Sequence, residues 1–413
     1  MSAAETFPKD DFSDLLPRFD QRGMDLELGR MARALNAMGN PCGSIPAIQV
    51  AGTNGKGSIC SFIASGLKAA GIRTGLTTSP HLVSWCERIR IDGTLITASE
   101  LRQRLLQRKP LVAIHQLTPF EQLLAAAFDH FAAGQVELLI LEVGLGGRLD
   151  ATTAHPIRPV IAMARIGLDH CEHLGSNLSA ITAEKAAVIN PGATVISAEQ
   201  EPEVTELLNT MAARQGALIK WVKPLSQDWQ LGLPGTMQHS NAAVARAALE
   251  ALQPLGWTLQ EEQIRAGLAA AEWPARLQTM VWQGHSVIID GAHNPQAAAQ
   301  LARERLNWTA PEQRVHWILG VQAHKDAPGM LRELMKPADQ AWIVPVAGHR
   351  SWRCSELKEA CPELALQLLE AKGVDQVLSR LENLGGWPSP APIVAGSLYL
   401  LGNLLGRGVF TAE

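Results

Sequence analysis

A glycine-rich segment with one lysine and one serine is the strongest chemical signal in the sequence. It reads Ala-Gly-Thr-Asn-Gly-Lys-Gly-Ser over residues 51–58, after the apolar run Ile45–Ala51 and before a helix-like stretch. Glycines let backbone N–H groups approach phosphate oxygens closely, a helix N-terminus favours an anion, and Lys56 adds a positive charge. The segment therefore predicts a nucleotide phosphate site, in which the Ser58 hydroxyl would contact Mg²⁺ bound to the nucleotide.

The loop departs from the standard pattern G-x-x-x-x-G-K-[ST]. Val50 stands where that pattern has its first glycine, and Gly57 separates Lys56 from Ser58. The loop is thus a shorter G-x-x-G-K-G-S variant and not the loop of ordinary kinases and GTPases. The alternative is a glycine-rich turn with an exposed lysine and no function, but a strand and a helix on the correct sides favour the phosphate site.

Three side chains further along the chain could serve the same site. Glu142 lies near the end of the apolar run Leu138–Val143, where a carboxylate is costly unless it is paired or binds a metal. It is a candidate Mg²⁺ ligand, with a structural ion pair to Arg148 or another basic residue as the alternative. We expect His170 to end a strand, where a metal ligand or general base would lie, although a lone histidine is more often structural. Lys185 lies in an otherwise apolar helical stretch, and a solvated helix face is its default interpretation.

Apolar, β-rich runs alternate with helix-like stretches along the chain, and the alternation restarts after about residue 273. This order predicts an α/β fold with two domains and mainly parallel sheets, residues 1–273 and 274–413, with the boundary in the Glu272–Arg276 segment. In such folds, ligands bind beyond the carboxyl ends of the strands. We expect strands over Ile45–Ala51, Leu138–Val143, Val160–Arg165, Ala193–Ser197, Val287–Asp290, Val315–Leu319, Trp342–Val346 and Ile393–Ala395.

Composition limits the class of protein further. The chain has 413 residues and a net charge of −4, with no long Lys/Arg run, which argues against nucleic acid as a partner. No apolar run reaches the ~18–20 residues of a membrane helix, and the acidic N-terminal segment does not resemble a signal peptide. The six cysteines are scattered without zinc spacing, so we expect reduced thiols in a cytoplasmic protein. Nearly all tryptophans lie after residue 220, and core packing is the simplest explanation.

Together these motifs resemble the bacterial folylpolyglutamate synthase/dihydrofolate synthase family, within the wider group of ATP-dependent Mur-type ligases. The resemblance extends over most of the chain in one order. The matching segments include AGTNGKGS (51–58), TTSPHL (77–82), ERIRIDG (87–93), LTPFE (117–121), LEVGLGGRLDAT (141–152), EKAAVI (184–189), IIDGAHNPQAA (289–299) and AHKD (323–326).

The resemblance implies a ligase with ATP held between two domains. A Mur-ligase-like N-terminal domain with the phosphate loop would bind ATP, Mg²⁺ and pteroate, and a smaller Rossmann-like C-terminal domain would close over the nucleotide. The implied reaction adds L-glutamate to 7,8-dihydropteroate and to the γ-carboxylate of reduced folates, through an acyl phosphate, with release of ADP and phosphate. ATP and two Mg²⁺ ions are the implied cofactors. We expect a monomer without nucleic-acid or membrane partners.

The resemblance also implies roles for single residues. Catalytic roles fall on Lys56, His170 and Lys185. ATP contacts fall on Asn54, Gly55, Lys56, Gly57, Ser58, Asn241, Arg276, Asp290 and His293, and pterin or pteroate contacts on Asp25, Phe120, Glu121, Arg148 and Asp150. Mg²⁺ ligands fall on Ser79, Glu142, His170 and an N-carboxylated Lys185, whose carbamate would act as an extra carboxylate.

Departures from the family pattern are few, and two other functions remain open. The family's DATN reads Asp150-Ala-Thr-Thr153, EKAG reads EKAA, and P-G-R reads Pro274-Ala-Arg276, so that Ala275 would stiffen a hinge. A Mur-type ligase for cell-wall precursors shares the phosphate loop and metal sites, but not SPHL and LTPFE as they stand here. A P-loop kinase or nucleotide-dependent switch predicts the standard loop, and Gly57 argues against it.

Overall fold

The computed structural model describes residues 12–16, 26–307, 313–383 and 385–412. The chain divides into two compact units. The N-terminal unit contains the described chain up to Leu233 and the segment from Gln238 to Trp273. The C-terminal unit contains Pro234–Met237 and the described chain from Pro274 onward. The division after Trp273 falls within the expected boundary segment. The short segment Pro234–Met237 belongs to the C-terminal unit, which no sequence pattern had indicated.

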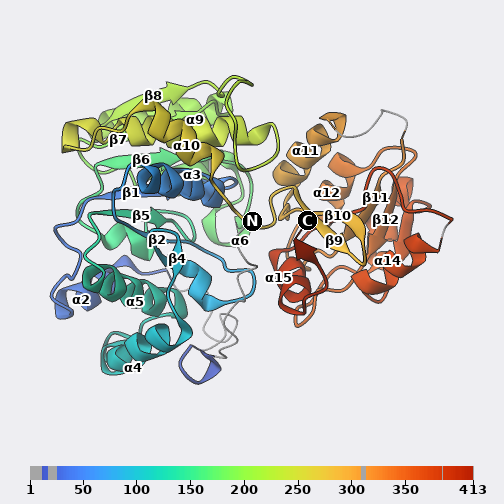
Figure 1. The fold of residues 1–413 in the computed structure, drawn as a ribbon, viewed down its shortest axis with the longest axis horizontal. Helices are drawn as coiled ribbons and strands as arrows, with labels where there is room; N and C mark the ends of the chain where they lie inside the picture. The colour runs from blue at the N-terminus through green and yellow to red at the C-terminus, as the bar shows by residue number, and fades with distance from the viewer. Residues whose placement is uncertain (1–11, 17–25, 308–312, 384, 413) are drawn as a thin grey trace. The chain divides into compact units, whose positions relative to one another are not determined.

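The N-terminal unit is built on a mainly parallel sheet with the strand order β4-β3-β2-β5-β1-β6-β7-β8 (Figure 1). Only the β2–β3 and β3–β4 pairs among these described strands are antiparallel. Strands β1, β5 and β6 are buried at every position, as expected for parallel strands covered on both faces. The strands are β1 (Ala47–Ala51), β2 (Thr74–Thr77), β3 (Ile89–Ile91), β4 (Thr94–Leu95), β5 (Leu138–Glu142), β6 (Val160–Met163), β7 (Thr194–Ala198) and β8 (Leu218–Val222).

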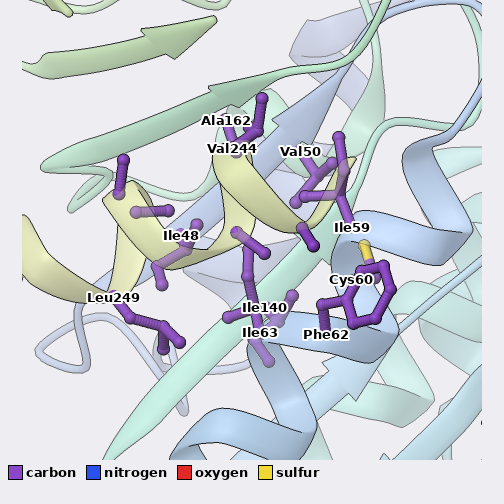
Figure 2. Packing of buried hydrophobic residues seen from close by; sticks show 14 of the residues in the cluster. Ile48, Val50, Ile59, Cys60, Phe62, Ile63, Ile140, Ala162, Val244 and Leu249 are labelled. Carbon is purple, nitrogen blue, oxygen red and sulfur yellow. The ribbon is translucent and has the colours of Figure 1, made fainter. Parts of the chain in front are cut away.

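Helices cover both faces of this sheet. On one face, α3 and α9 share a hydrophobic cluster with β1, β5 and β6, which includes Ile48, Ile63 and Val244 (Figure 2). On the other face, Leu139 and Leu141 of β5 pack with α2, α4 and α5. The helices are α2 (Leu28–Ala37), α3 (Lys56–Ala69), α4 (Ala98–His115), α5 (Pro119–Ala133), α6 (Cys171–Leu174), α7 (Leu178–Ala186), α8 (Pro202–Arg214), α9 (Met237–Glu250) and α10 (Glu261–Ala269), with short 3₁₀ turns η1 (Phe12–Asp14), η2 (Trp85–Arg88), η3 (Ala151–Ala154) and η4 (Gln253–Leu255).

The C-terminal unit has its own sheet with the strand order β13-β12-β11-β14-β10-β9-β15. Strands β9 and β15 are antiparallel additions, and the pairs from β13 to β10 are parallel. Its core includes the fully buried Trp317 of β11. The elements are β9 (Gln278–Trp282), β10 (His285–Ile289), α11 (Pro295–Glu304), η5 (Arg305–Asn307), β11 (His316–Leu319), α12 (Ala327–Leu334), β12 (Gln340–Ile343), α13 (Cys354–Ala360), η6 (Pro362–Leu364), β13 (Leu368–Glu370), α14 (Val374–Glu382), β14 (Ile393–Ala395), α15 (Leu398–Gly406) and β15 (Thr411–Ala412).

The predicted α/β fold with mainly parallel sheets in both parts is confirmed. Each expected strand is present; Ile393–Ala395 has the expected bounds, and the other strands differ at one or both ends. One placement is wrong, because His170 does not end a strand. Strand β6 stops at Met163, and the backbone of Arg165 bonds instead to Thr53 and Asn54 of the phosphate loop, so the chain leaves the sheet early. His170 follows as the N-cap of α6 with φ 51°.

The six cysteines all lie in the described part of the chain and form no disulfide there. Five of them are buried, and Cys171 is exposed. Across the described ranges, no helix is both long enough and apolar enough to cross a bilayer.

Candidate active site

The phosphate loop joins the carboxyl end of β1 to the first turn of α3. Gly52 and Gly55 adopt φ angles of 126° and 97°, the left-handed region that glycine reaches without a steric penalty. A Cβ on Gly52 would lie 2.6 Å from the Ala164 carbonyl oxygen, and a Cβ on Gly55 would lie 2.6 Å from Asn241 Oδ1. Both positions therefore require glycine, and Asn241 of α9 lies directly beside the loop.

The first turn of α3 has free capacity to bind an anion. The helix begins at Lys56, and the first N–H groups of a helix lack intrahelical acceptors. The Ser58 hydroxyl is buried in this turn and has no hydrogen-bond partner within the described residues. Leaving such a group unsatisfied costs about 1–3 kcal/mol, which a bound ligand can offset. The turn thus suits the predicted phosphate and Mg²⁺ contacts.

Two lysines share one carbonyl oxygen of this loop. Lys56 Nζ donates to Gly52 O at 3.2 Å and to Thr53 O at 3.1 Å, and Lys185 Nζ of α7 donates to Gly52 O at 3.0 Å. Lys185 is only 4% exposed, so the interpretation as a solvated helix face is wrong. Burial first, and the charge of Lys56 second, lower the pKa of Lys185 to about 7. Near neutral pH, a large part of this amine is therefore uncharged and nucleophilic.

Glu142 and Ser79 meet at the carboxyl edge of the sheet. Glu142 ends β5 and pairs with Val50 of β1, whereas Ser79 follows β2 on the other side of β5. The Glu142 carboxylate is 4% exposed and accepts a hydrogen bond from the Ser79 backbone N–H at 2.9 Å. Arg148, the ion-pair partner considered for Glu142, pairs with Glu184 at 2.9 Å instead. A buried carboxylate thus lies beside the strand that leads into the phosphate loop.

His170 lies in the loop that follows β6, partly exposed to solvent. Its Nε2 is 3.9 Å from Asp169 Oδ2, and the Asp169 charge acts on Lys185, where it opposes the lowering of the pKa. Among the residues that the structure describes, no three His, Cys, Asp or Glu side chains are grouped to hold a metal ion. A metal held by Ser79, Glu142 and His170 would therefore need further oxygen ligands, which phosphates or a carbamate can provide.

Two candidate pteroate residues, Arg148 and Asp150, lie in the loop after Glu142, and a third, Phe120 of α5, lies close to it. Asp150 is buried, and its Oδ2 accepts from the N–H groups of Gly144 at 2.9 Å and Leu145 at 3.0 Å. Its Oδ1 accepts from Thr152 N at 3.0 Å, and burial raises the Asp150 pKa against these hydrogen bonds. A Cβ on Gly144 would lie 2.9 Å from the ring of Phe120. Asp150 therefore shapes the loop, and Phe120 lies against it.

Glu121 is occupied by an ion pair that sequence reasoning missed. It is buried at the start of α5, where its carboxylate accepts from Thr118 N at 2.7 Å in a capping box. The same carboxylate lies 3.3 Å from Nε of the buried Arg30 of α2. The T-x-x-E pattern could have indicated the cap, but no local signal indicates Arg30. Asp25, another pteroate candidate, lies outside the described residues.

Glu87 is a second residue that sequence reasoning missed. Its buried carboxylate accepts from three successive backbone N–H groups, those of Leu82, Val83 and Ser84, at 2.9, 2.7 and 2.5 Å. The S-x-x-E spacing is a capping-box signal that could have found it. Through these bonds Glu87 holds the chain that follows Ser79.

The C-terminal unit brings its three nucleotide candidates to one turn after β10. Asp290 accepts from Leu277 N at 3.0 Å and Ala292 N at 2.8 Å. Burial raises the Asp290 pKa, and the charges of Arg276 and then His293 oppose that effect. Arg276, Asp290 and His293 are therefore neighbours within this unit.

Comparisons with known proteins show the family of the chain. The model of the dihydrofolate synthetase C-terminal domain matches residues 275–407. The chain is 31% identical to the dihydrofolate synthase/folylpolyglutamate synthase of Bacillus subtilis, over 93% of this chain and 95% of that protein. The chain belongs to the dihydrofolate synthase/folylpolyglutamate synthase family. The resemblance indicated by the motifs is confirmed.

Solved structures of this family share the fold along nearly the whole chain. The Mycobacterium tuberculosis folylpolyglutamate synthase complexed with ADP and AMPPCP is 30% identical, with a TM-score of 0.85 over 94% of this chain and 96% of that one. The bifunctional enzyme of Yersinia pestis, complexed with AMPPNP and Mn ion, is 29% identical, with a TM-score of 0.81 over 94% of each chain. The chain therefore has the fold of ATP-dependent ligases that bind nucleotide and a divalent metal.

Proposed function

We propose that this protein is an ATP-dependent carboxylate–amine ligase that adds L-glutamate to 7,8-dihydropteroate and to the γ-carboxylate of reduced folates. One observation carries the proposal. The buried Ser58 hydroxyl, for which the described residues provide no partner, lies in the first turn of α3, just after the strand β1 that pairs with Glu142 of β5. The chain also aligns along nearly its whole length with such ligases. We further propose a monomeric, cytoplasmic enzyme without a nucleic-acid partner, in keeping with its net charge of −4.

The reaction has to activate a carboxylate, which does not react with an amine near neutral pH. The γ-phosphoryl group of ATP passes to the pteroate or folate carboxylate and gives an acyl phosphate and ADP. The amine of L-glutamate attacks the acyl carbon, loses a proton, and phosphate leaves as the amide forms. Lys56 and the N–H groups that open α3 stabilise the charge on the transferring phosphoryl group. No nucleophile of the protein takes part, so catalysis rests on positioning.

Four side chains are proposed to hold two Mg²⁺ ions, namely Ser79, Glu142, His170 and Lys185. Bound Mg²⁺ would neutralise phosphate charge. The fit is supported by the buried Glu142 carboxylate, an oxygen ligand of the kind Mg²⁺ prefers, at the edge where the phosphate loop begins. A carbamate forms when the neutral Lys185 amine adds to CO₂ and loses a proton. The pKa of about 7 for the Lys185 amine supports this step, because it leaves much of the amine neutral near pH 7.

The remaining contacts are proposed from their places in the two units. In the N-terminal unit, the nucleotide would meet the loop and the neighbouring α9, through Asn54, Gly55, Gly57 and Asn241. In the C-terminal unit it would meet Arg276, Asp290 and His293. Pteroate would meet Phe120 and the exposed Arg148 on the loop that Asp150 braces, while Glu121 holds the start of α5.

The test is ADP release by the purified protein with MgATP, L-glutamate and dihydropteroate. We expect turnover that requires both cosubstrates, and turnover with tetrahydrofolate in place of dihydropteroate. ADP release that requires neither dihydropteroate nor tetrahydrofolate would overturn the proposal. Release that needs a nucleotide-linked cell-wall precursor instead would favour the Mur-type alternative.

A further inference from the structure

Gly57 differs from the other glycines of the phosphate loop. Gly52 and Gly55 have positive φ angles, whereas Gly57 lies within the first turn of α3. A Cβ added to Gly57 would lie 2.7 Å from Nε1, 2.8 Å from Cε2 and 3.0 Å from Cζ2 of Trp273. The edge of an indole ring thus occupies the place of the missing side chain. The contact explains why glycine stands between Lys56 and Ser58.

Trp273 is held against α3 by more than this contact. The residue before it, Glu272, accepts a hydrogen bond through its carbonyl oxygen from Ser61 Oγ at 2.8 Å. Ser61 lies one turn after Gly57 on α3. The indole also packs against the hydrophobic cluster of the N-terminal unit, and the Arg90 guanidinium lies 5.9 Å from the ring centroid. The segment that ends the N-terminal unit is therefore attached to the helix of the phosphate loop at two points.

We propose that Trp273 is a positioning residue for the nucleotide. Its indole supports the first turn of α3, so that the N–H groups of that turn and Ser58 Oγ keep the geometry needed for phosphate. The inference rests on the proposed function, because it assumes that this turn binds the nucleotide. Trp273 is also the last residue of its unit, and Arg276 follows three residues later in the chain.

A double-mutant cycle separates this role from a direct need for glycine at the phosphates. The dissociation constant of MgADP is measured by equilibrium dialysis for the wild type, Gly57→Ala, Trp273→Ala and the double variant. We expect Gly57→Ala to weaken binding about tenfold or more and Trp273→Ala to weaken it several-fold. The double variant should bind more tightly than Gly57→Ala alone, because the indole that meets the new Cβ is gone. A double variant no better than Gly57→Ala would overturn the inference.

Two controls keep the outcome interpretable. Gly66→Ala lies on the same helix, and its Cβ would lie 2.5 Å from Leu249 Cδ1, so this variant should lose thermal stability but keep its affinity for MgADP. Trp273→Leu keeps apolar packing without the indole edge. If Trp273→Ala does not fold, Trp273→Leu takes its place in the cycle. Steady-state kinetics should show a raised KM for ATP in Trp273→Leu with a smaller change in kcat.

Failure of the two proposals can be told apart. If the wild type does not bind MgADP, the proposed function fails, and the role of Trp273 fails with it. If the wild type binds MgADP and Trp273→Ala and Trp273→Leu bind it equally well, only the positioning role is overturned.

Discussion

Replacing Lys185 by methionine tests the buried amine beside the phosphate loop. The pKa of Lys185 is lowered from 10.5 to about 7 in the folded protein, first by burial and then by the charge of Lys56. Between these two pH values, the unfolded state binds more protons than the folded state. The free energy of unfolding therefore rises with pH across this window. Below pH 7 the amine is charged in both states, so its full destabilising effect on the folded protein is present. Lys185→Met removes the titrating group while it keeps a long apolar side chain.

The magnitude follows from the two pKa values. With 10.5 for the unfolded chain and about 7 for the folded one, linkage gives a gain of about 2 kcal/mol in the free energy of unfolding between pH 7 and pH 9. The Met variant should lack this gain. It should also be the more stable protein at pH 7, since Gly52 O keeps Lys56 Nζ as a donor.

Urea unfolding read by pulse proteolysis, in CO₂-free buffer without nucleotide, measures this difference at both pH values. The matched control is Lys68→Met, which removes an exposed lysine from α3 and should keep the pH dependence of the wild type. Equal pH dependence in the wild type and Lys185→Met would show that the folded protein holds this amine charged. The argument that Lys185 is ready to react with CO₂ would then be refuted.

Three further substitutions test other parts of the site. Glu142→Ala should abolish ADP release with little change in thermal unfolding, because a buried ligand is lost but not a packing group; near-normal release would contradict the metal assignment. Ala275 has a φ of 58°, which costs an L-residue ~1–2 kcal/mol, and the greater freedom of unfolded glycine offsets ~0.4–1 of it. Ala275→Gly should therefore raise the free energy of unfolding by ~0.5–1 kcal/mol in urea titrations, and a decrease would refute the strain. Arg30→Ala leaves Glu121 buried without its ion-pair partner and should cost ~3–5 kcal/mol, against ~0–1 for the exposed Arg33→Ala; equal costs would refute the importance of burial.

The parts of the site that the sequence predicts are those with a local cause. The phosphate loop can be recognised from the sequence because its parts are consecutive in the chain. They are a strand, a loop with glycines and a helix with a lysine in its first turn. Glu142 was predictable for a similar reason, because a carboxylate at the end of an apolar run stands out. Parallel pairing then brings the ends of β1, β2 and β5 to one edge, which explains why Ser79 lies beside Glu142.

Distant contacts decide the rest, and they leave no local pattern. Lys185 lies on an ordinary helix, and only the fold shows that its amine reaches the Gly52 carbonyl. The segment Pro234–Met237 looks like any loop, yet the buried Glu304 of α11 accepts a hydrogen bond from Thr236 N at 2.6 Å and attaches this segment to the C-terminal unit. Neither interaction has a spacing in the sequence that could have indicated it.

The three glycines of the phosphate loop separate the two kinds of cause. Gly52 and Gly55 have positive φ angles, which favour glycine at these positions even before any contact with Ala164 or Asn241 is considered. Gly57 has an ordinary helical position, where alanine would favour the helix by up to ~1 kcal/mol. What excludes alanine there is a tryptophan from the far end of the unit. The extra glycine that departs from the standard phosphate-loop pattern is therefore explained by a tertiary contact with Trp273, and only the structure identifies this partner.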